Sequence, residues 1–217
     1  MTARSEILEL RATGMVCSSL GTLVGDEMAA AFMKEAAAAR ESLESLDRSG
    51  GFVDVERSHG IASAATHSSV LDLLAVAVGS NPVLDAAHIR RDNAHMLPGH
   101  LSSWHIDAED PSMARMIVYL NTVTAAGATF EAIPKGFPIT PLRLRCLGDV
   151  TSNRLYDPPT DSELSLLVPR EAWRSVSGPP STTIIASTGS ILHRVRPGSG
   201  TRWTLTLTYL PSKAPVT

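Results

Sequence analysis

The stretch TRWTLTLTYL, residues 201–210, alternates polar and apolar residues and gives the clearest strand signal in the sequence. A period of two predicts a β-strand with one polar and one apolar face. The apolar face is formed by Trp203, Leu205, Leu207 and Tyr209. The polar face is formed by Arg202, Thr204, Thr206 and Thr208. Two arrangements explain the pattern: an outer strand whose polar face meets solvent, or a barrel whose polar interior holds a ligand.

Upstream of this strand, helix-forming segments come first and strand-forming segments follow. Residues 24–46 are rich in alanine, glutamate, leucine and lysine and predict a helix, and residues 68–78 predict a second one. From about residue 88 onward, short β-leaning runs such as 114–123 and 181–188 alternate with proline and glycine. The sequence therefore predicts a mainly β protein with N-terminal α-helices.

A length of 217 residues fits one domain. We expect a helical part over about 1–85 and a β core over about 86–212. Residues 134–180 are irregular, rich in proline, serine and arginine, and too long for an ordinary connection. They predict a binding loop or a lid.

Composition excludes several classes of partner. The formal net charge is -3, so no electrostatic attraction to nucleic acid is expected. The most apolar run, residues 70–79, is far shorter than the roughly 20 residues that cross a bilayer and contains Asp72. Glu6 and Glu9 interrupt the stretch where a secretory signal would be apolar. We therefore expect a cytoplasmic protein with neither nucleic-acid nor membrane partners.

His105 and Asp107 stand two residues apart in SSWHIDAED, residues 102–110. Residues i and i+2 share a face of a strand but point about 200° apart on a helix, so the pair can bind one ligand only on extended backbone. The preceding Pro-Gly pair favours that conformation. An isolated H-x-D pair is more often two ordinary polar residues, so metal binding requires a further ligand.

His193, at the end of a later apolar run, can supply that ligand. Two histidines and one carboxylate make the facial triad that leaves three positions of an iron(II) ion open. Arg202 follows nine residues later, and Thr204 shares its strand face. A planar guanidinium with a hydroxyl beside it is suited to hold a carboxylate.

The order H-x-D, a long gap, H, about ten residues and then R-x-T resembles the iron(II)- and 2-oxoglutarate-dependent dioxygenases, especially the phytanoyl-CoA hydroxylase-like branch. WHID (104–107) is similar to that branch's W-H-x-D, and GSILHRV (189–195) to the strand with its distal histidine. VYLNTVTAAGATFEAIPKG (118–136) is similar to its strand, glycine-rich turn and T-x-F-x-x-P run. The resemblance covers roughly residues 14–210, and it departs at AGATF, where the family more often has paired glycines.

The resemblance implies a double-stranded β-helix, the cupin-like jelly roll. It also implies that His105, Asp107 and His193 are the catalytic iron(II) ligands. Arg202 and Thr204 would then hold the distal carboxylate of the co-substrate 2-oxoglutarate, with dioxygen as the oxidant. Relatives that halogenate have alanine or glycine in place of the aspartate, so Asp107 favours hydroxylation, with desaturation or ring formation as other outcomes.

Further contacts are expected around this centre, and each of these residues could equally be ordinary core or surface. Thr129 and Asn121 are predicted to bind the co-substrate, and Tyr119 the substrate. Just upstream of the metal segment, cationic and amide groups suit a small carboxylate-bearing substrate such as an amino acid or a natural-product acid: Arg90, Arg91, Asn93 and His95. Adjacent arginines on a strand cannot both face the pocket.

Two alternatives stay open from the sequence. A zinc hydrolase or cupin-type isomerase could use two histidines and one aspartate, but it has no evident use for Arg202 and Thr204. A non-enzymatic jelly-roll binding module would bury His105 without a metal.

Overall fold

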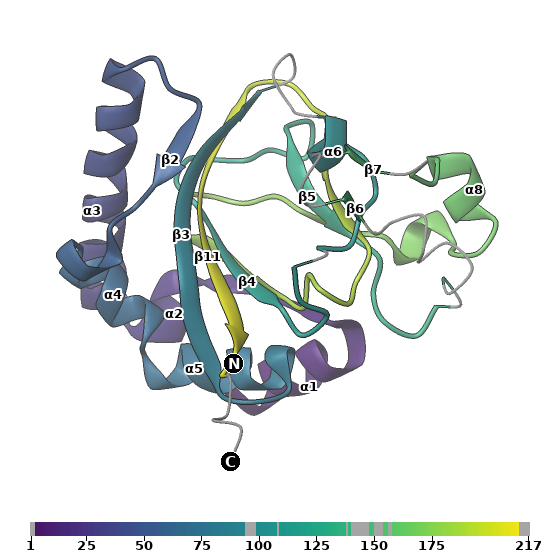
Figure 1. The fold of residues 1–217 in the computed structure, drawn as a ribbon, viewed down its shortest axis with the longest axis horizontal. Coiled ribbons are helices and arrows are strands. Elements are labelled where there is room, and N and C mark those ends of the chain that lie inside the picture. Colours follow the sequence, from purple (N-terminus) through teal and green to yellow (C-terminus); the bar gives the residue numbers. More distant parts are fainter. Residues whose placement is uncertain are drawn as a thin grey trace.

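Six strands form the main sheet of the computed structural model, which describes residues 3–93, 99–107, 109–137, 139, 148–149, 154–155 and 158–212 (Figure 1). In spatial order the strands are β1 (Met15–Ser19), β9 (Thr182–Ala186), β4 (Ala114–Tyr119), β11 (Thr201–Pro211), β3 (Pro82–Asn93) and β2 (Gly50–Phe52). All neighbouring pairs among them are antiparallel.

A smaller antiparallel sheet packs against the main one. Its strands, in order, are β10 (His193–Arg196), β5 (Thr129–Ala132) and β8 (Arg174–Val176). Apolar side chains from both sheets fill the space between them, among them Ile117, Tyr119, Phe130, Val176 and Ile184. Two antiparallel sheets with a shared core are the arrangement of a jelly roll. The described strands, which also include the short pair β6 (Gly148–Asp149) and β7 (Arg154–Leu155), do not close into one barrel.

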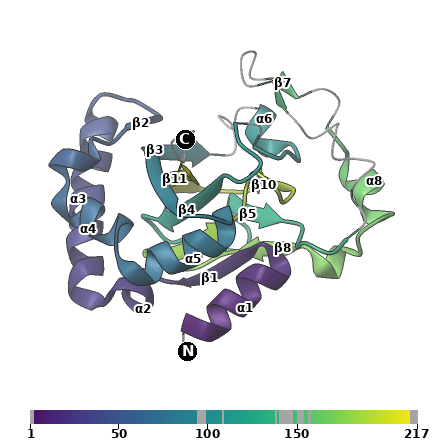
Figure 2. The same ribbon diagram turned by 60° about the horizontal axis from the view of Figure 1, so that its bottom comes forward.

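The N-terminal helices cover the outer face of the main sheet (Figures 1 and 2). They are α1 (Ala3–Thr13), α2 (Leu20–Val24), α3 (Asp26–Ser45), the 3-10 turn η1 (Val55–Arg57), α4 (His59–Ala65) and α5 (Ser68–Val78). The helices predicted at 24–46 and 68–78 are therefore confirmed as α3 and α5. The part predicted as helical, about 1–85, also contains β1, β2 and the start of β3.

None of the described helices has by itself the length and apolar character to cross a membrane, although the bent pair α4 and α5 reaches both when taken together. In this fold α5 packs on the main sheet with four fully or nearly buried apolar residues: Val70, Leu73, Leu74 and Val78.

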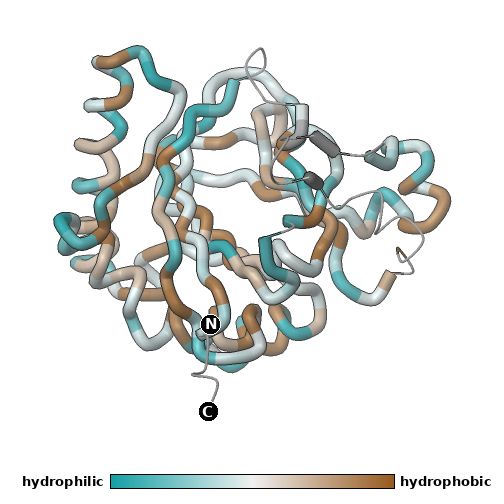
Figure 3. The backbone as a smooth tube through the Cα atoms, in the orientation of Figure 1, coloured by the Kyte–Doolittle hydropathy of each residue, from teal (hydrophilic) through white to brown (hydrophobic). Residues whose placement is uncertain are grey.

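Strand β11 separates two environments. Its apolar residues, Trp203, Leu205, Leu207 and Tyr209, are buried in the core beneath the helices, and the Tyr209 hydroxyl donates a hydrogen bond of 2.9 Å to the Ala65 carbonyl. Burial of each such side chain contributes roughly 1.5–3 kcal/mol. Arg202, Thr204 and Thr206 line a pocket between the sheets. The polar-interior explanation of the alternation is therefore confirmed, and the outer-strand explanation is wrong. In Figure 3, polar residues also gather at the end of β3 formed by residues 90–93.

The segment predicted as a lid, 134–180, is only partly described. Its described residues include α8 (Asp161–Ser165), the 3-10 turn η2 (Arg170–Ala172) and β8. A capping box begins α8: Thr160 accepts a hydrogen bond from the Glu163 backbone N–H, and the Glu163 carboxylate accepts one from the Thr160 N–H. Residues 138, 140–147, 150–153 and 156–157 lie outside the described part. The lid stays a prediction.

Candidate metal centre

His105 and His193 lie directly opposite each other, although they are far apart in the sequence. His105 follows the short helix α6 (Gly99–Ser102), and His193 begins β10. Each donates its backbone N–H to the carbonyl of the other at 2.9 Å, as an antiparallel pair does. Side chains of directly opposed residues share a face, and the two ring centroids are 4.3 Å apart. The extended backbone predicted at His105 is confirmed, while residues 99–102 form a helical turn.

Asp107 completes the set from the same face. Its Oδ1 lies 3.9 Å from His105 Nε2, and its Oδ2 lies 3.8 Å from His193 Nε2. One possible ligand atom from each of the three residues lies within 4.8 Å of the others. The Asp107 N–H donates to the Thr188 carbonyl at 3.1 Å, which fixes the backbone just beyond the histidine pair. The structure therefore brings together the three residues that the sequence selects.

Both imidazoles present their Nε2 atoms to this space. His105 Nδ1 lies 2.8 Å from the Ser103 carbonyl, and His193 Nδ1 lies 3.2 Å from the Ile191 carbonyl. A carbonyl only accepts, so each Nδ1 carries the proton and each Nε2 keeps a lone pair for a metal. Burial lowers the pKa of His105 to about 3, and burial also lowers the pKa of His193. Both rings are therefore neutral at physiological pH, as metal ligands must be.

Asp107 is held in its ionised form by a residue that the sequence did not reveal. Arg115, on β4, has its Nε 3.0 Å from Asp107 Oδ2. Burial of Asp107 by itself raises its pKa, but the Arg115 guanidinium outweighs that effect and holds the pKa below its ordinary value. One signal was available: an arginine in the otherwise apolar run ARMIVY, residues 114–119. Its partner could not be read from the sequence.

The donor set fits a divalent metal ion. It offers two neutral imidazole nitrogens and one ionised carboxylate, all nearly buried. This combination suits iron(II), and zinc also accepts it. The residues present therefore agree with the metal that the sequence predicted.

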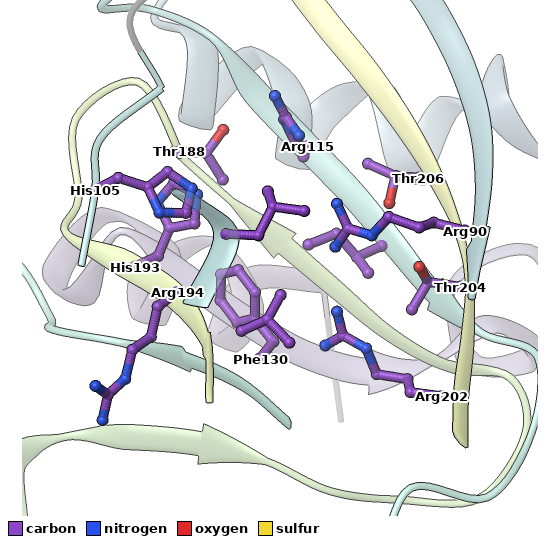
Figure 4. A pocket seen from close by; sticks show the side chains of 13 residues that line it. Arg90, His105, Arg115, Phe130, Thr188, His193, Arg194, Arg202, Thr204 and Thr206 are labelled. Carbon is purple, nitrogen blue, oxygen red and sulfur yellow. The ribbon is translucent and has the colours of Figure 1, made fainter. Parts of the chain in front are cut away.

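A pocket adjoins the two histidines, and Figure 4 shows it between them and the inner face of β11. Its apolar wall is formed by Leu101, Ile117, Phe130 and Val195. Its polar lining includes three arginines and three threonines, Arg90, Arg115, Arg202, Thr188, Thr204 and Thr206, and Arg194 borders it with the guanidinium directed away. The two histidines and the predicted carboxylate clamp thus border one space, and Asp107 lies next to the histidines.

Within this pocket, Arg202 and Thr204 each have a donor group without an acceptor among the described residues. Arg202 Nη1 and Thr204 Oγ1 are buried and have no hydrogen-bond partner in the described part of the chain. The two residues are only 3% and 1% exposed, so solvent does not satisfy these groups. An orphaned guanidinium N–H beside an orphaned hydroxyl fits a ligand carboxylate.

Arg202 is nevertheless not wholly free, which differs from the predicted clamp. Its Nε donates to Asp92 Oδ2 at 3.0 Å, and its Nη2 donates to the same oxygen. Arg90 approaches the other side of this carboxylate, with its Nε 2.7 Å from Asp92 Oδ1. Asp92 and Arg202 are cross-strand partners on β3 and β11. Among the described residues, Nη1 is therefore the nitrogen of the Arg202 guanidinium that remains without a partner and can bind a ligand carboxylate.

Three further predicted contacts lie outside the set of residues that line this pocket. Thr129 is buried and shares a hydrogen bond of 2.8 Å with the Ser175 hydroxyl. Tyr119 is buried next to Arg202; its hydroxyl donates to the Val176 carbonyl at 2.8 Å and accepts from the Phe130 N–H. Asn121 joins two strands by donating to the Thr201 carbonyl and accepting from the Trp203 N–H. All three stabilise the strands around the site.

The predicted substrate contacts upstream of the metal segment separate by strand face. Arg90 lines the pocket, whereas Arg91 lies 5.7 Å over the Trp203 ring and pairs with Asp47 on the helix side. The alternation of β3 gives Asn93 the same face as Arg91. The structure therefore does not bring Arg91 and Asn93 to the pocket. His95 lies outside the described residues.

Solved structures with the same fold cover nearly the whole chain. EctD from S. alaskensis, crystallised with 2-oxoglutarate and 5-hydroxyectoine, has a TM-score of 0.64 and 17% identity, over 97% of this chain and 76% of its own. HygX from Streptomyces hygroscopicus, with nickel and 2-oxoglutarate bound, has a TM-score of 0.59 and 15% identity, over 98% and 88%.

The non-heme alpha ketoglutarate dependent epimerase SnoN from nogalamycin biosynthesis has a TM-score of 0.62 and 14% identity, over 97% of this chain and 81% of its own. These similarities confirm the predicted jelly-roll fold. No family model matches the sequence, and a search of curated proteins gives no match.

Proposed function

We propose that this chain is an iron(II)- and 2-oxoglutarate-dependent dioxygenase. The observation that carries the proposal is the presence of two complementary sites at one pocket: the set His105, Asp107 and His193, whose two histidines line it, and the orphaned donors of Arg202 and Thr204. A keto diacid needs both, because its oxo-acid end chelates a metal while its far carboxylate needs a cationic donor. The fold shared with structures that hold 2-oxoglutarate agrees with this proposal.

Each residue then has a defined task. His105, Asp107 and His193 hold the metal, and Arg115 keeps Asp107 ionised and oriented. When bound, iron(II) with 2-oxoglutarate and dioxygen supplies the oxidative decarboxylation, which releases succinate and carbon dioxide, and the oxidising power that cleaves a C–H bond. Arg202 Nη1 and Thr204 Oγ1 bind the distal carboxylate.

The apolar side of the pocket has a separate task. Ile117, Phe130 and Val195 line the space next to the histidines and exclude water from it. Exclusion of water strengthens the electrostatic interactions of the bound groups and suppresses side reactions.

For the reaction itself, we propose hydroxylation of an unactivated C–H bond in a small carboxylate-bearing molecule, an amino acid or a natural-product intermediate. Support comes from Arg90, the predicted substrate contact that lines the pocket, and from the retained aspartate ligand. The comparison structures include one with 5-hydroxyectoine and one epimerase. Because these proteins differ in their chemistry, the type of reaction that this chain catalyses has to be determined by product analysis.

The decisive experiment is anaerobic addition of iron(II) and 2-oxoglutarate to the metal-free protein. A weak visible charge-transfer band of the chelated oxo acid is expected. Asp107→Ala removes a ligand and should lose the band. Glu109→Gln is the matched control, because Glu109 is a nearby carboxylate that is 46% exposed and whose ion pair among the described residues is with Arg115 at 3.8 Å.

The same measurement addresses the zinc alternative. Metal binding without the band would favour the hydrolase or isomerase. Failure of the unsubstituted protein to bind any divalent metal would favour the non-enzymatic binding module. Aerobic screening of small acids and amino acids for substrate-dependent succinate release then identifies the substrate class.

A further inference from the structure

A single carboxylate behind the metal centre is bonded to the neighbours of both histidine ligands. Trp104 precedes His105, and Arg194 follows His193. Asp161 Oδ1 accepts a hydrogen bond of 2.8 Å from Trp104 Nε1 and one of 2.6 Å from Arg194 Nη1. Its Oδ2 accepts from Arg194 Nη2 at 3.0 Å. We call these three residues, Asp161, Arg194 and Trp104, the clasp.

The clasp lies on the reverse side of the histidine pair. His105 and His193 are directly opposed, so the residues next to them, Trp104 and Arg194, project from the other face. Arg194 Cζ lies 4.3 Å over the Trp104 ring, which confirms that these two neighbours meet. In Figure 4 the Arg194 guanidinium points away from the pocket.

The backbone pairing between the two histidine segments is short. The pairing of His105 with His193 is an isolated bridge, not part of a continuous ladder. Beyond the two hydrogen bonds of this bridge, the Asp107 N–H to Thr188 carbonyl bond is the next described backbone bond along the ligand segment. Side-chain contacts therefore add to the restraint: the bonds of Trp104 and Arg194 to Asp161, and the apolar cluster that contains Ile106 and Leu192.

The geometry of the clasp is also well defined. Arg194 is fixed on its second side by Glu131, its cross-strand partner on β5, at 2.8 Å from Nε and 2.7 Å from Nη2. The Arg194 side chain is 12% exposed, and paired, nearly buried guanidinium groups of this kind are rigid. The carboxylate of Asp161 comes from the first residue of α8, whose capping box fixes the helix start.

We propose that Asp161 is a positioning residue for the metal centre, which sets metal affinity by holding the two histidine-bearing segments together from behind through Trp104 and Arg194. This inference rests on the metal centre of the proposed function but not on its co-substrate. Residues that orient metal ligands typically change metal affinity 10- to 100-fold when replaced. Asp161 acts through the neighbours of the ligands, so the lower end of that range is expected.

The test is calorimetric titration of the metal-free protein with nickel(II) alone, without co-substrate. Asp161→Asn keeps the shape but removes the charge, and it should raise the Kd about ten-fold. Arg170→Gln is the matched control, because Arg170 pairs with the same carboxylate at 3.6 Å but is 56% exposed and contacts neither histidine segment in the described bonds. Its Kd should stay within about two-fold of the unsubstituted value.

A second variant keeps the proposal testable if Asp161→Asn does not fold. Trp104→Phe removes the hydrogen bond of the indole together with part of its buried ring, leaves the ion pairs of Arg194 with Asp161 and Glu131 in place, and should raise the Kd about three-fold. Trp173→Phe is its control: Trp173 packs edge-on against Trp104, but its Nε1 donates to the Val168 carbonyl and not to Asp161. Trp173→Phe removes the same atoms as Trp104→Phe, and both tryptophans belong to one apolar cluster.

If Asp161 affects the affinity for nickel(II), then nickel(II) binding must in turn stabilise the segment around Asp161, because linkage between two sites is reciprocal. Nickel(II) should slow hydrogen exchange of the amides in residues 161–172 of the unsubstituted protein and should lose that effect in Asp161→Asn. If Asp161 served only the packing of α8, Asp161→Asn would lower the stability of the fold, but nickel(II) would not slow hydrogen exchange in residues 161–172 of the unsubstituted protein.

The outcomes separate the two proposals. Equal nickel affinity, within two-fold, for the unsubstituted protein and folded Asp161→Asn overturns the clasp and leaves the metal centre standing; if Asp161→Asn is unfolded, equal affinity of Trp104→Phe does the same. Absence of nickel binding by the unsubstituted protein overturns the metal centre and the proposed function with it.

Discussion

Asp92 offers the sharpest test of the pocket, because it is a buried carboxylate shared by two arginines. It is 1% exposed and Arg202 is 3% exposed, while the Arg90 side chain is 25% exposed. Asp92→Asn keeps the volume but removes the charge and places an amide N–H₂ where only acceptors are needed. Removing one partner of a buried ion pair costs about 3–5 kcal/mol, because the other charge stays desolvated.

Urea unfolding should therefore show a lower midpoint with an unchanged slope. A chain of this length loses roughly 2–4 °C of Tm per kcal/mol, so a fall of about 6–20 °C is expected. Asp85→Asn is the control: Asp85 lies on the same strand and is exposed, and its effect should stay within about 0.5 kcal/mol. A loss below about 1 kcal/mol for Asp92→Asn would refute the reasoning, since water would then be screening the pair.

The pH dependence of this difference follows from the pKa of Asp92. Burial opposes its ionisation, but Arg202 and Arg90 outweigh burial and lower the pKa below its ordinary value. The carboxylate therefore stabilises the fold fully above the unfolded-state pKa of about 3.9 and loses this effect as pH falls through the lower folded-state pKa. The stability difference between the two proteins should be constant from about pH 8 to 5 and shrink only below about pH 4.

Three further predictions concern other parts of the structure. Arg115→Met removes the cation that keeps Asp107 ionised and oriented, so the metal-free protein should lose about 3 kcal/mol in urea unfolding and nickel(II) should stabilise the variant less than it stabilises the unsubstituted protein; an equal metal-induced increase would contradict this. Tyr209→Phe leaves the Ala65 carbonyl without its donor and should cost about 1–3 kcal/mol, and no measurable change would mean that another group satisfies that carbonyl. Gly14→Ala should destabilise by more than about 1 kcal/mol, because Gly14 has a φ of 80° and an added Cβ would meet Ile191; Gly79→Ala, at a φ of 81° with open space around it, separates backbone strain from steric contact.

The sequence predicted those features that depend on neighbours within a few residues. The helix at α3 follows from its composition, and the face of β11 that holds Arg202 and Thr204 follows from strict alternation. His105 and Asp107 share a face because their spacing matches the period of a strand. The selection of His193 as a third ligand came from the order and spacing of a family motif, and the structure places it beside the other two.

What the sequence alone determined is therefore the secondary structure of its regular segments, the face each polar residue takes, and a short set of metal-ligating candidates. Only the tertiary structure decided that Asp92 occupies two nitrogens of Arg202, that Arg115 pairs with Asp107, and that Asp161 joins the neighbours of both histidines. The physical reason is that local periodicity fixes the direction of a side chain, whereas its partner depends on strand register and on the packing of segments that are distant in the chain.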